Sequence, residues 1–281
     1  MLASEAIAQA LWDLEEEIEV ETVEPPPTDL PYEDGVPLES PWHRAQINLL
    51  IDLICCFWYG RTDFYVGGNM FVYYNLEQTR YNLEQLRGKS NRGPDFFLVR
   101  NVDGTRPRKS WILWAEGGRY PDLIIELLSP STASVDKTLK KELYARVFRT
   151  PEYYWYDPDS GELQGWRLNG DQYQALEPDE QGRLWSEVAQ LWLGTWVGKY
   201  LYEQAQWLRF FDAEGQLVLT EAEQAQAARE AAEARAQEEQ AAREAAEARA
   251  REEQAARQSA EAELARLRAE LARLRGASAG S

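Results

Sequence analysis

The spacing of apolar and polar positions predicts two helices in the first part of the chain. Residues 4–20 repeat apolar side chains at helical intervals and stop at a triple proline. This predicts an N-terminal amphipathic helix over 1–24 and a proline-rich spacer over 25–31. Ser40 is a candidate N-cap followed by proline, so a second, largely buried helix is expected over about 41–59.

Short apolar runs bounded by glycine and polar turn residues predict strands in the middle of the chain. These runs cover 64–66, 70–74, 96–99, 123–128, 153–156, 163–168, 172–176, 191–196 and 207–219. A helix from Ser131 or Ser134 to about Arg149 interrupts them, with Leu139, Leu143 and Val147 recurring every four residues. The pattern predicts a mixed α/β domain over 32–219, whose last part is a β-rich extension.

A change of composition marks the C-terminal segment over 220–275. A ten-residue sequence rich in alanine, glutamate and arginine occurs twice, starting at Ala227 and Ala241, and the charges fall at i,i+4 intervals that support an exposed helix. Leucines take coiled-coil spacing only near the end, from Leu264 to Leu274. The segment is predicted as a long helix, either solvated or in a weak coiled coil, with a flexible tail over 276–281.

Composition and charge narrow the functional classes. The 281 residues carry a formal net charge of −18, which disfavours long-range attraction to nucleic acid, although lysine and arginine are denser between Arg80 and Arg149. The adjacent Cys55 and Cys56 are expected to be buried as small hydrophobes in a reducing, cytoplasmic setting. No leader and no uncharged run long enough to span a bilayer is found, so no membrane partner is expected.

Two apolar runs that each begin with Pro-Asp carry the candidate chemistry. Asp95 opens the first, and Glu126 lies inside the second, where a carboxylate is costly unless it is protonated, paired or bound to a cation. If the two strands are neighbours, Asp95 and Glu126 present oxygens to one hard cation such as Mg²⁺. Lys140, on the following helix, is then placed to steady a developing negative charge or a metal-bound water. A structural ion pair is the competing interpretation.

Other polar residues near these runs are less decisive. Lys137 and Lys141 lie within reach of phosphate on the same helix, or simply face solvent. His43 is the single histidine, which excludes multi-histidine zinc sites and disfavours a serine hydrolase; a phosphate contact, ordering of Glu39 and a structural hydrogen bond all remain open for it. Asp122 lies four residues before Glu126 and is expected to pair or to cap.

Several spaced motifs resemble the bacterial Uma-two family, which belongs to the restriction-endonuclease-like PD-(D/E)XK superfamily. The motifs are Gly-Pro-Asp-Phe-Phe at 93–97, Pro-Asp-Leu-Ile-Ile-Glu-Leu-Leu-Ser at 121–129, Asp136 with Lys140 and Tyr144, and Thr-Pro-Glu-Tyr-Tyr-Trp-Tyr-Asp-Pro at 150–158. The resemblance covers roughly residues 30–215 and implies a restriction-endonuclease-like mixed β-sheet core flanked by helices.

The resemblance also implies roles for individual residues. Asp95 and Glu126 correspond to the acids of the second and third strands, and Glu39 to a glutamate of the upstream helix that serves as a metal or water ligand. Leu128 stands where the superfamily's lysine follows the second acid, so Lys140 is expected to be a relocated substitute. Glu33 is an alternative upstream acid, although a solvated loop residue is the plainer interpretation.

The expected function is a metal-dependent endonuclease that hydrolyses DNA phosphodiester bonds with Mg²⁺, or alternatively Mn²⁺. Its catalytic residues are Glu39, Asp95, Glu126 and Lys140, of which the three acids hold the metal. A catalytically inactive nucleic-acid or protein-binding module is the alternative, and an adaptor acting through the C-terminal helix is a third hypothesis. A homodimer with that helix as its contact is a further hypothesis.

Overall fold

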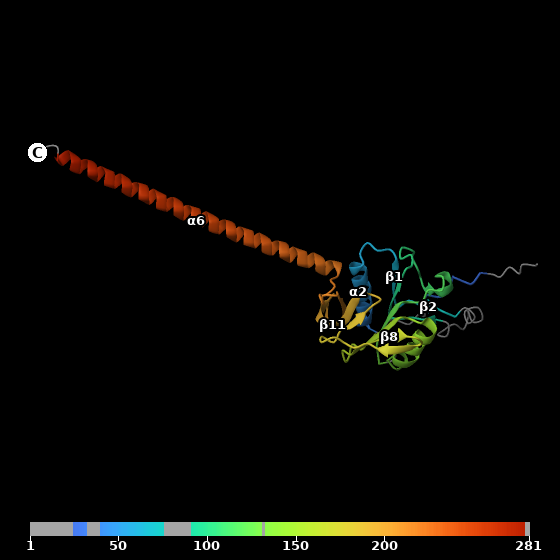
Figure 1. Cartoon of the computed structure of the whole chain (residues 1–281). Coiled ribbons are helices and arrows are strands. Elements are labelled where there is room, and N and C mark those ends of the chain that lie inside the picture. Colours follow the sequence, from blue (N-terminus) through green and yellow to red (C-terminus); the bar gives the residue numbers. More distant parts are fainter. Residues whose placement is uncertain (1–24, 33–39, 76–90, 131–132, 279–281) are drawn as a thin grey trace, which may run out of the picture. The chain divides into compact units, whose positions relative to one another are not determined.

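A computed structural model describes residues 25–32, 40–75, 91–130 and 133–278 of the chain (Figure 1). The chain divides into two compact units, one ending at Val218 and one beginning at Leu219, and each is described by itself. The N-terminal helix predicted over 1–24 lies outside the described residues. Within the predicted spacer, Leu30 is buried and the Pro27 carbonyl accepts a hydrogen bond from Trp114 Nε1, so this part is docked on the first unit.

The first unit contains the strands expected from its apolar runs, together with short strands at 91–92, 111–112 and 184–186 that the runs did not predict. In chain order the elements are α2 (Pro41–Phe57), β1 (Phe64–Gly68), β2 (Val72–Tyr73), β3 (Asn91–Arg92), β4 (Phe96–Arg100), β5 (Trp111–Ile112), η1 (Leu113–Ala115), β6 (Leu123–Leu127), α4 (Ala133–Val135), η2 (Asp136–Lys140), α5 (Lys141–Leu143), η3 (Tyr144–Phe148), β7 (Glu152–Tyr156), β8 (Leu163–Asn169), β9 (Gln172–Ala175), β10 (Leu184–Ser186), β11 (Leu191–Tyr200) and β12 (Glu203–Phe211).

A six-stranded mixed sheet forms the centre of the unit, with the strand order β1-β4-β6-β7-β8-β9. Strands β6 and β7 are parallel, and the other neighbouring pairs are antiparallel. The crossover between the parallel strands is the helical segment from α4 to η3. Two three-stranded sheets, β10-β11-β12 and β3-β2-β5, complete the β structure, so the mixed sheet and β-rich extension predicted from the sequence are present.

Helix α2 covers one face of the central sheet and contacts both β1 and β12 (Figure 1, blue). It begins where Ser40 Oγ accepts a hydrogen bond from the His43 amide and Pro41 takes the first turn. Gln46 fixes it to the extension by accepting from the Leu208 amide at 2.8 Å and donating to the Leu208 carbonyl at 2.9 Å. The helix predicted over 41–59 is therefore confirmed.

The prediction that the two cysteines are buried is wrong. Cys55 is exposed and Cys56 is intermediate in exposure, whereas Leu53 and Ile54 just before them are fully buried. The inward stripe of α2 passes through the leucines and isoleucines, and consecutive positions on a helix point about 100° apart. Cys55 therefore lies on the side of the helix that the sheet does not cover.

Alternation along the central strands divides the core between the two faces of the sheet. On the α2 face, Phe96, Leu98, Ile125 and Tyr156 join residues of α2 and of the β10-β11-β12 sheet. On the other face, aromatic residues pack against the crossover segment: Phe97, Trp111, Tyr144, Phe148, Tyr153, Trp155 and Trp166. Glu126 lies between Ile124 and Leu128 on this second face.

The crossover segment is helical from Ala133 to Phe148 and includes two π-helical stretches, η2 and η3. The expected helix is present, but its predicted buried stripe is wrong, because Leu139 is 69% exposed and Val147 is 45% exposed. The inward stripe runs through Asp136, Tyr144 and Phe148, with the mostly buried Lys140 between them. Because the inward stripe carries two charged residues, the spacing of apolar residues in the sequence predicted the wrong face of this helix as buried.

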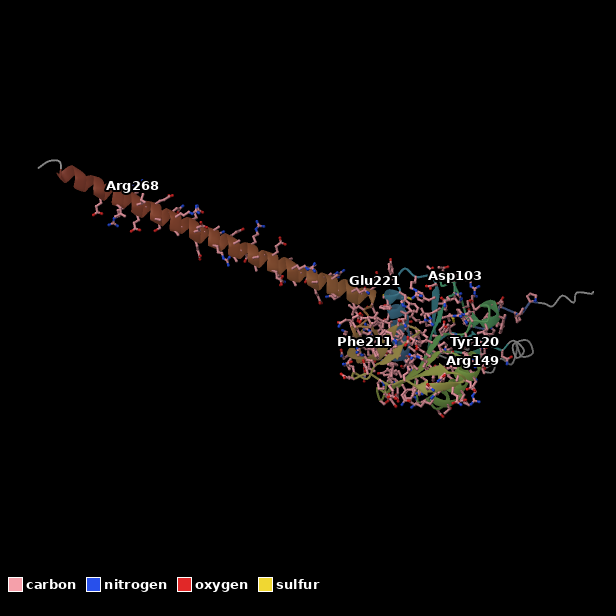
Figure 2. The ribbon with its side chains drawn as sticks, viewed as in Figure 1. Asp103, Tyr120, Arg149, Phe211, Glu221 and Arg268 are labelled. Atoms are coloured by element: carbon pink, nitrogen blue, oxygen red, sulfur yellow. The ribbon has the colours of Figure 1, made fainter. Side chains whose placement is uncertain are left out.

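The second unit contains the single long helix α6 (Glu221–Ser278), as the alanine-rich repeat predicts. Thr220 and Glu223 start it with a reciprocal capping box: the Thr220 amide donates to Glu223 Oε2, and the Glu223 amide donates to Thr220 Oγ1. Side chains project outward along its length between the labelled Glu221 and Arg268 (Figure 2). The i,i+4 pairs include Arg243 with Glu247 and Arg257 with Glu253.

Candidate active site

Two acids face each other across neighbouring strands of the central sheet. Strands β4 and β6 pair with Phe96 opposite Ile125, which brings Asp95, directly before β4, beside Glu126. The Leu127 amide donates to Asp95 Oδ2 at 2.7 Å, and the Asp95 amide lies 3.4 Å from Glu126 Oε2. The sequence-based expectation that Asp95 and Glu126 come together is therefore confirmed, with Glu126 fully buried and Asp95 partly accessible.

Lys140 reaches the same point from the crossover helix. Its Nζ lies 3.1 Å from Glu126 Oε2 and 2.7 Å from Asp136 Oδ1, so one ammonium contacts two buried carboxylates. Tyr144 donates its hydroxyl to the other Glu126 oxygen at 2.8 Å. Asp136, Lys140 and Tyr144 are spaced four apart on the inward face of the helix, which lets all three side chains meet around Glu126.

The electrostatics of this cluster follow from burial. Desolvation raises the pKa of Glu126 to about 8, and the Lys140 charge opposes this rise without cancelling it. Desolvation likewise raises the pKa of Asp95 to about 6. Burial alone would lower the pKa of Lys140, but the charges of Glu126, Asp136 and Asp95 outweigh it and raise that pKa. One ammonium is therefore surrounded by more carboxylates than it can neutralise.

This donor set fits a small hard cation. Mg²⁺ prefers carboxylate oxygens, keeps several waters and is commonly held by one or two carboxylates together with substrate phosphate, which Asp95 and Glu126 can provide. Within the described ranges, no three His, Cys, Asp or Glu side chains are arranged to hold a metal on their own. The third ligand predicted from the sequence, Glu39, and its alternative Glu33 both lie outside the described residues, so these roles stay predictions.

The remaining candidates take structural positions. Asp122 accepts from the Arg100 amide at 2.6 Å and pairs with Arg119 at 3.3 Å, as expected for a pairing residue at the start of β6. His43 contacts Ser40 Oγ through Nδ1 at 2.9 Å, and its buried Nε2 has no hydrogen-bond partner among the described residues. Tyr144, Tyr154 and Trp155 are buried in the core.

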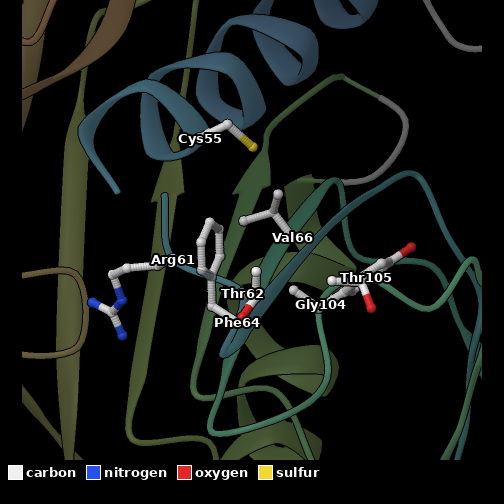
Figure 3. Close-up of a pocket in the computed structure, with 8 residues that line it drawn as sticks. Cys55, Arg61, Thr62, Phe64, Val66, Gly104 and Thr105 are labelled. Carbon is white, nitrogen blue, oxygen red and sulfur yellow. The ribbon is translucent and has the colours of Figure 1, made fainter. Parts of the chain in front are cut away.

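A hollow of about 220 Å³ lies elsewhere on the first unit (Figure 3). Its lining includes Cys55, Phe64, Val66 and Thr105, together with Arg61, which is already paired with Asp63 at 2.9 Å. None of the acids around Lys140 lines it. Among the described residues, its lining has no carboxylate, lysine or histidine, so the acid–lysine cluster remains the better candidate for metal-dependent chemistry.

Two contacts of this cluster were not assigned from the sequence. Asp136 pairs with Lys140 and Tyr144 donates to Glu126, whereas the sequence predicts no role at the site for either residue. The i,i+4 spacing of the three helix residues is the signal that could have indicated them. A carboxylate, an amine and a hydroxyl on one stripe of a helix that follows a buried acid require a polar partner inside the fold.

The family comparison agrees with the motifs. The model of the Uma2 family, described as "Putative restriction endonuclease", matches residues 15–197, which is more than half of the chain. The chain belongs to the Uma2 family. The matched range contains Asp95, Glu126, Lys140 and the whole central sheet, so the family expected from the sequence is confirmed together with its mixed α/β fold class.

Individual proteins show only weak similarity to this Uma2 family member. One similar solved structure is titled a "putative nuclease belonging to DUF820" from Anabaena variabilis; the identity is 17%, the coverage is 52% of this chain and 73% of that chain, and the TM-score is 0.35. The search of curated proteins gave no match. Among the described residues, no helix has both the length and the apolar surface needed to cross a bilayer.

Proposed function

We propose that this chain is a metal-dependent endonuclease that hydrolyses phosphodiester bonds of DNA. The observation that carries the proposal is the convergence of Asp95, Glu126 and Lys140 at one end of the β4–β6 pair. Two acids with raised pKa values and one ammonium are costly for a fold that only needs stability. Membership of a family described as a restriction endonuclease agrees with this chemistry.

Each residue has a distinct task in the proposed reaction. Asp95 and Glu126 bind Mg²⁺, or Mn²⁺ in its place, with Glu39 as a further ligand. When bound, the metal acts as a Lewis acid on the phosphate and lowers the pKa of a coordinated water. Lys140 provides a positive charge 3.1 Å from Glu126, where it can orient the attacking water or stabilise the charge that develops on phosphate oxygens.

Tyr144 and Asp136 hold the side chains of Glu126 and Lys140 in position. Tyr144 donates to one Glu126 oxygen, which leaves the other oxygen for Lys140 or a cation. Asp136 retains the ammonium by an i,i+4 pair at 2.7 Å, so Lys140 stays near the site when a cation takes Glu126. Side chains locked by such partners are what a pre-organised site requires.

The test is DNA cleavage by the full chain with Mg²⁺ or Mn²⁺, on single- and double-stranded substrates, beside EDTA. The variants Asp95→Asn, Glu126→Gln and Lys140→Met keep the shape of each side chain and remove its charge. Each is expected to lower cleavage by at least a hundredfold, as for loss of a principal electrostatic group. Lys199→Met, an exposed lysine on β11, is the matched control and should cleave like wild type.

The outcomes separate the alternatives. Cleavage that persists in Lys140→Met would remove the relocated lysine from the mechanism but leave the metal acids. A folded wild type that binds Mn²⁺ and cleaves neither DNA form would contradict the proposal. Salt-dependent DNA retention without cleavage would then favour a binding module.

A further inference from the structure

We propose that Lys137 and Lys141 form a binding surface for the phosphodiester backbone of the nucleic-acid strand beside the acid–lysine cluster. The inference rests on the proposed function, because it assumes that the nucleic-acid strand passes the acid–lysine cluster. Both lysines lie on the crossover helix, one turn apart, on either side of the inward-facing Lys140. Neither has a role in the cluster around Glu126.

Aromatic faces hold both ammonium groups in place. Lys137 Nζ lies 4.3 Å from the centre of the Trp155 ring, and Lys141 Nζ lies 3.7 Å from the centre of the Trp166 ring. Such cation–π contacts fix a flexible side chain without neutralising its charge. The two rings are themselves neighbours, with centroids 6.1 Å apart, so the two cations are held on one continuous aromatic surface.

The position of this surface follows from the sheet register. Trp155 is the direct partner of Glu126 in the parallel β6–β7 pair, and both residues face the crossover helix. Neighbouring strands lie about 4.8 Å apart, so Trp155, whose ring centre lies 4.3 Å from Lys137 Nζ, is one strand spacing from Glu126. Lys141 follows four residues further along the crossover segment.

The charges of both lysines remain available to a ligand. In the part of the chain that the structure describes, neither ammonium lies within ion-pair distance of a carboxylate, whereas Lys140 between them contacts two. In a chain with a net charge of −18, two cations held together without acid partners suggest an anionic partner. Phosphate groups at successive positions of one strand fit two cations spaced along a helix.

The tryptophans are not free to stack on bases. Trp155 is 3% exposed and Trp166 is 8% exposed, because the lysine side chains and the sheet cover their faces. Base stacking requires an open aromatic face, whereas backbone contacts position a strand without reading its sequence. The surface therefore fits the backbone and carries no sequence preference.

Acidic residues limit the binding surface at the Lys141 end. Lys141 itself borders a hollow of about 200 Å³ that is also lined by Glu142, Arg146, Asp171 and Tyr173, with Arg146 already paired to Glu142 at 2.8 Å. The two acids make this hollow unfavourable for another phosphate. We therefore expect two backbone contacts on this side of the cluster, one at each lysine.

The test measures the salt dependence of binding of labelled single- and double-stranded DNA of two unrelated sequences. It uses the full chain in EDTA, so that hydrolysis does not enter. Lys137→Met with Lys141→Met keeps the tryptophan faces covered and removes only the charges. Losing two phosphate contacts should reduce the slope of log affinity against log salt by about 1.4 on single strands and 1.8 on duplex, equally for both sequences.

Controls separate charge from packing. Lys137→Arg with Lys141→Arg should restore binding, and Lys199→Met, which removes the same charge from β11, should leave the slope unchanged. An unchanged slope in the double methionine variant, or no DNA binding by wild type at any salt concentration, would overturn the proposal. A lysine-dependent slope in a chain that never cleaves DNA would refute the proposed hydrolysis and retain the surface.

Discussion

Replacing Glu126 by glutamine should stabilise the metal-free protein at alkaline pH, although it removes a residue of the candidate active site. Glu126 is fully buried and its pKa is raised from 4.5 to about 8. Between pH 6 and 8 the unfolded chain has lost this proton and the folded chain still holds it. The protonated Glu126 therefore contributes its full stabilisation below pH 4.5, and this contribution is lost as the pH rises through 8.

The magnitude follows from one proton per molecule. One pH unit corresponds to about 1.4 kcal/mol, and the folded carboxyl is half ionised at pH 8, so the free energy of unfolding should fall by about 2 kcal/mol between pH 6 and 8. For a unit of about 200 residues this lowers Tm by roughly 5–10 °C. Glu126→Gln cannot ionise and still offers an oxygen to the Tyr144 hydroxyl, so this part of the pH dependence should disappear.

Tryptophan fluorescence during thermal unfolding in EDTA measures this effect in the first unit alone, because all eleven tryptophans precede residue 208. Glu180→Gln, at an exposed carboxylate before β10, is the matched control and should unfold like wild type. The reasoning is refuted if Glu126→Gln lowers Tm at pH 8. Glu126 would then be ionised in a stabilising ion pair with Lys140, and its burial would be no sign of function.

Three further changes test the contacts around the site and the two units. Tyr144→Phe removes the hydrogen bond to Glu126, so urea titration should show a loss of about 1–2 kcal/mol at pH 6. Because this hydrogen bond lowers the pKa of Glu126, the pH-dependent fall in stability should extend to a higher pH in the variant. Glu152→Gln disrupts a buried carboxylate that accepts from Ser186 Oγ at 2.5 Å and from Arg167 at 3.2 Å; the same titration should lose about 3–5 kcal/mol, while cleavage per folded molecule stays constant. Deleting residues 221–281 should leave the fluorescence-detected Tm within about 2 °C, because α6 belongs to the second unit. Sedimentation of the full-length and the shortened protein tests the homodimer hypothesis, which fails if both proteins are monomers.

The acids could be predicted from the sequence because a charge inside an apolar strand has few inexpensive explanations. Every residue of β6 is buried, and Glu126 lies between Ile124 and Leu128 on the face toward the crossover helix. The pairing of β4 with β6 could not be derived from spacing alone, since the register depends on the partner strand. The motif resemblance supplied what the local pattern lacked.

The crossover helix shows why the rest could not be predicted. An apolar stripe indicates a buried face only when the neighbouring element is apolar, and here the neighbour is Glu126. Lys140 points inward as expected, but Asp136 points inward with it and Leu139 remains 69% exposed. Residues 169–171 lie between two predicted strands, but β8 extends to Asn169 and the hairpin loop is only Gly170 and Asp171, because Gly170 adopts the positive φ of +65° that the turn requires.

The net charge of −18 should affect how DNA affinity depends on salt concentration. At 0.15 M salt the Debye length is about 8 Å, so Lys137 and Lys141 act locally while the acids elsewhere are screened. At 0.01 M salt it is about 30 Å, and the whole acidic chain repels the phosphates. DNA affinity should therefore stop rising, or fall, as salt drops below roughly 0.05 M, instead of following the straight line that counterion release alone gives. Anisotropy titrations from 0.01 to 0.3 M would decide this, because a line that stays straight to the lowest salt would mean that the distant acids do not affect binding.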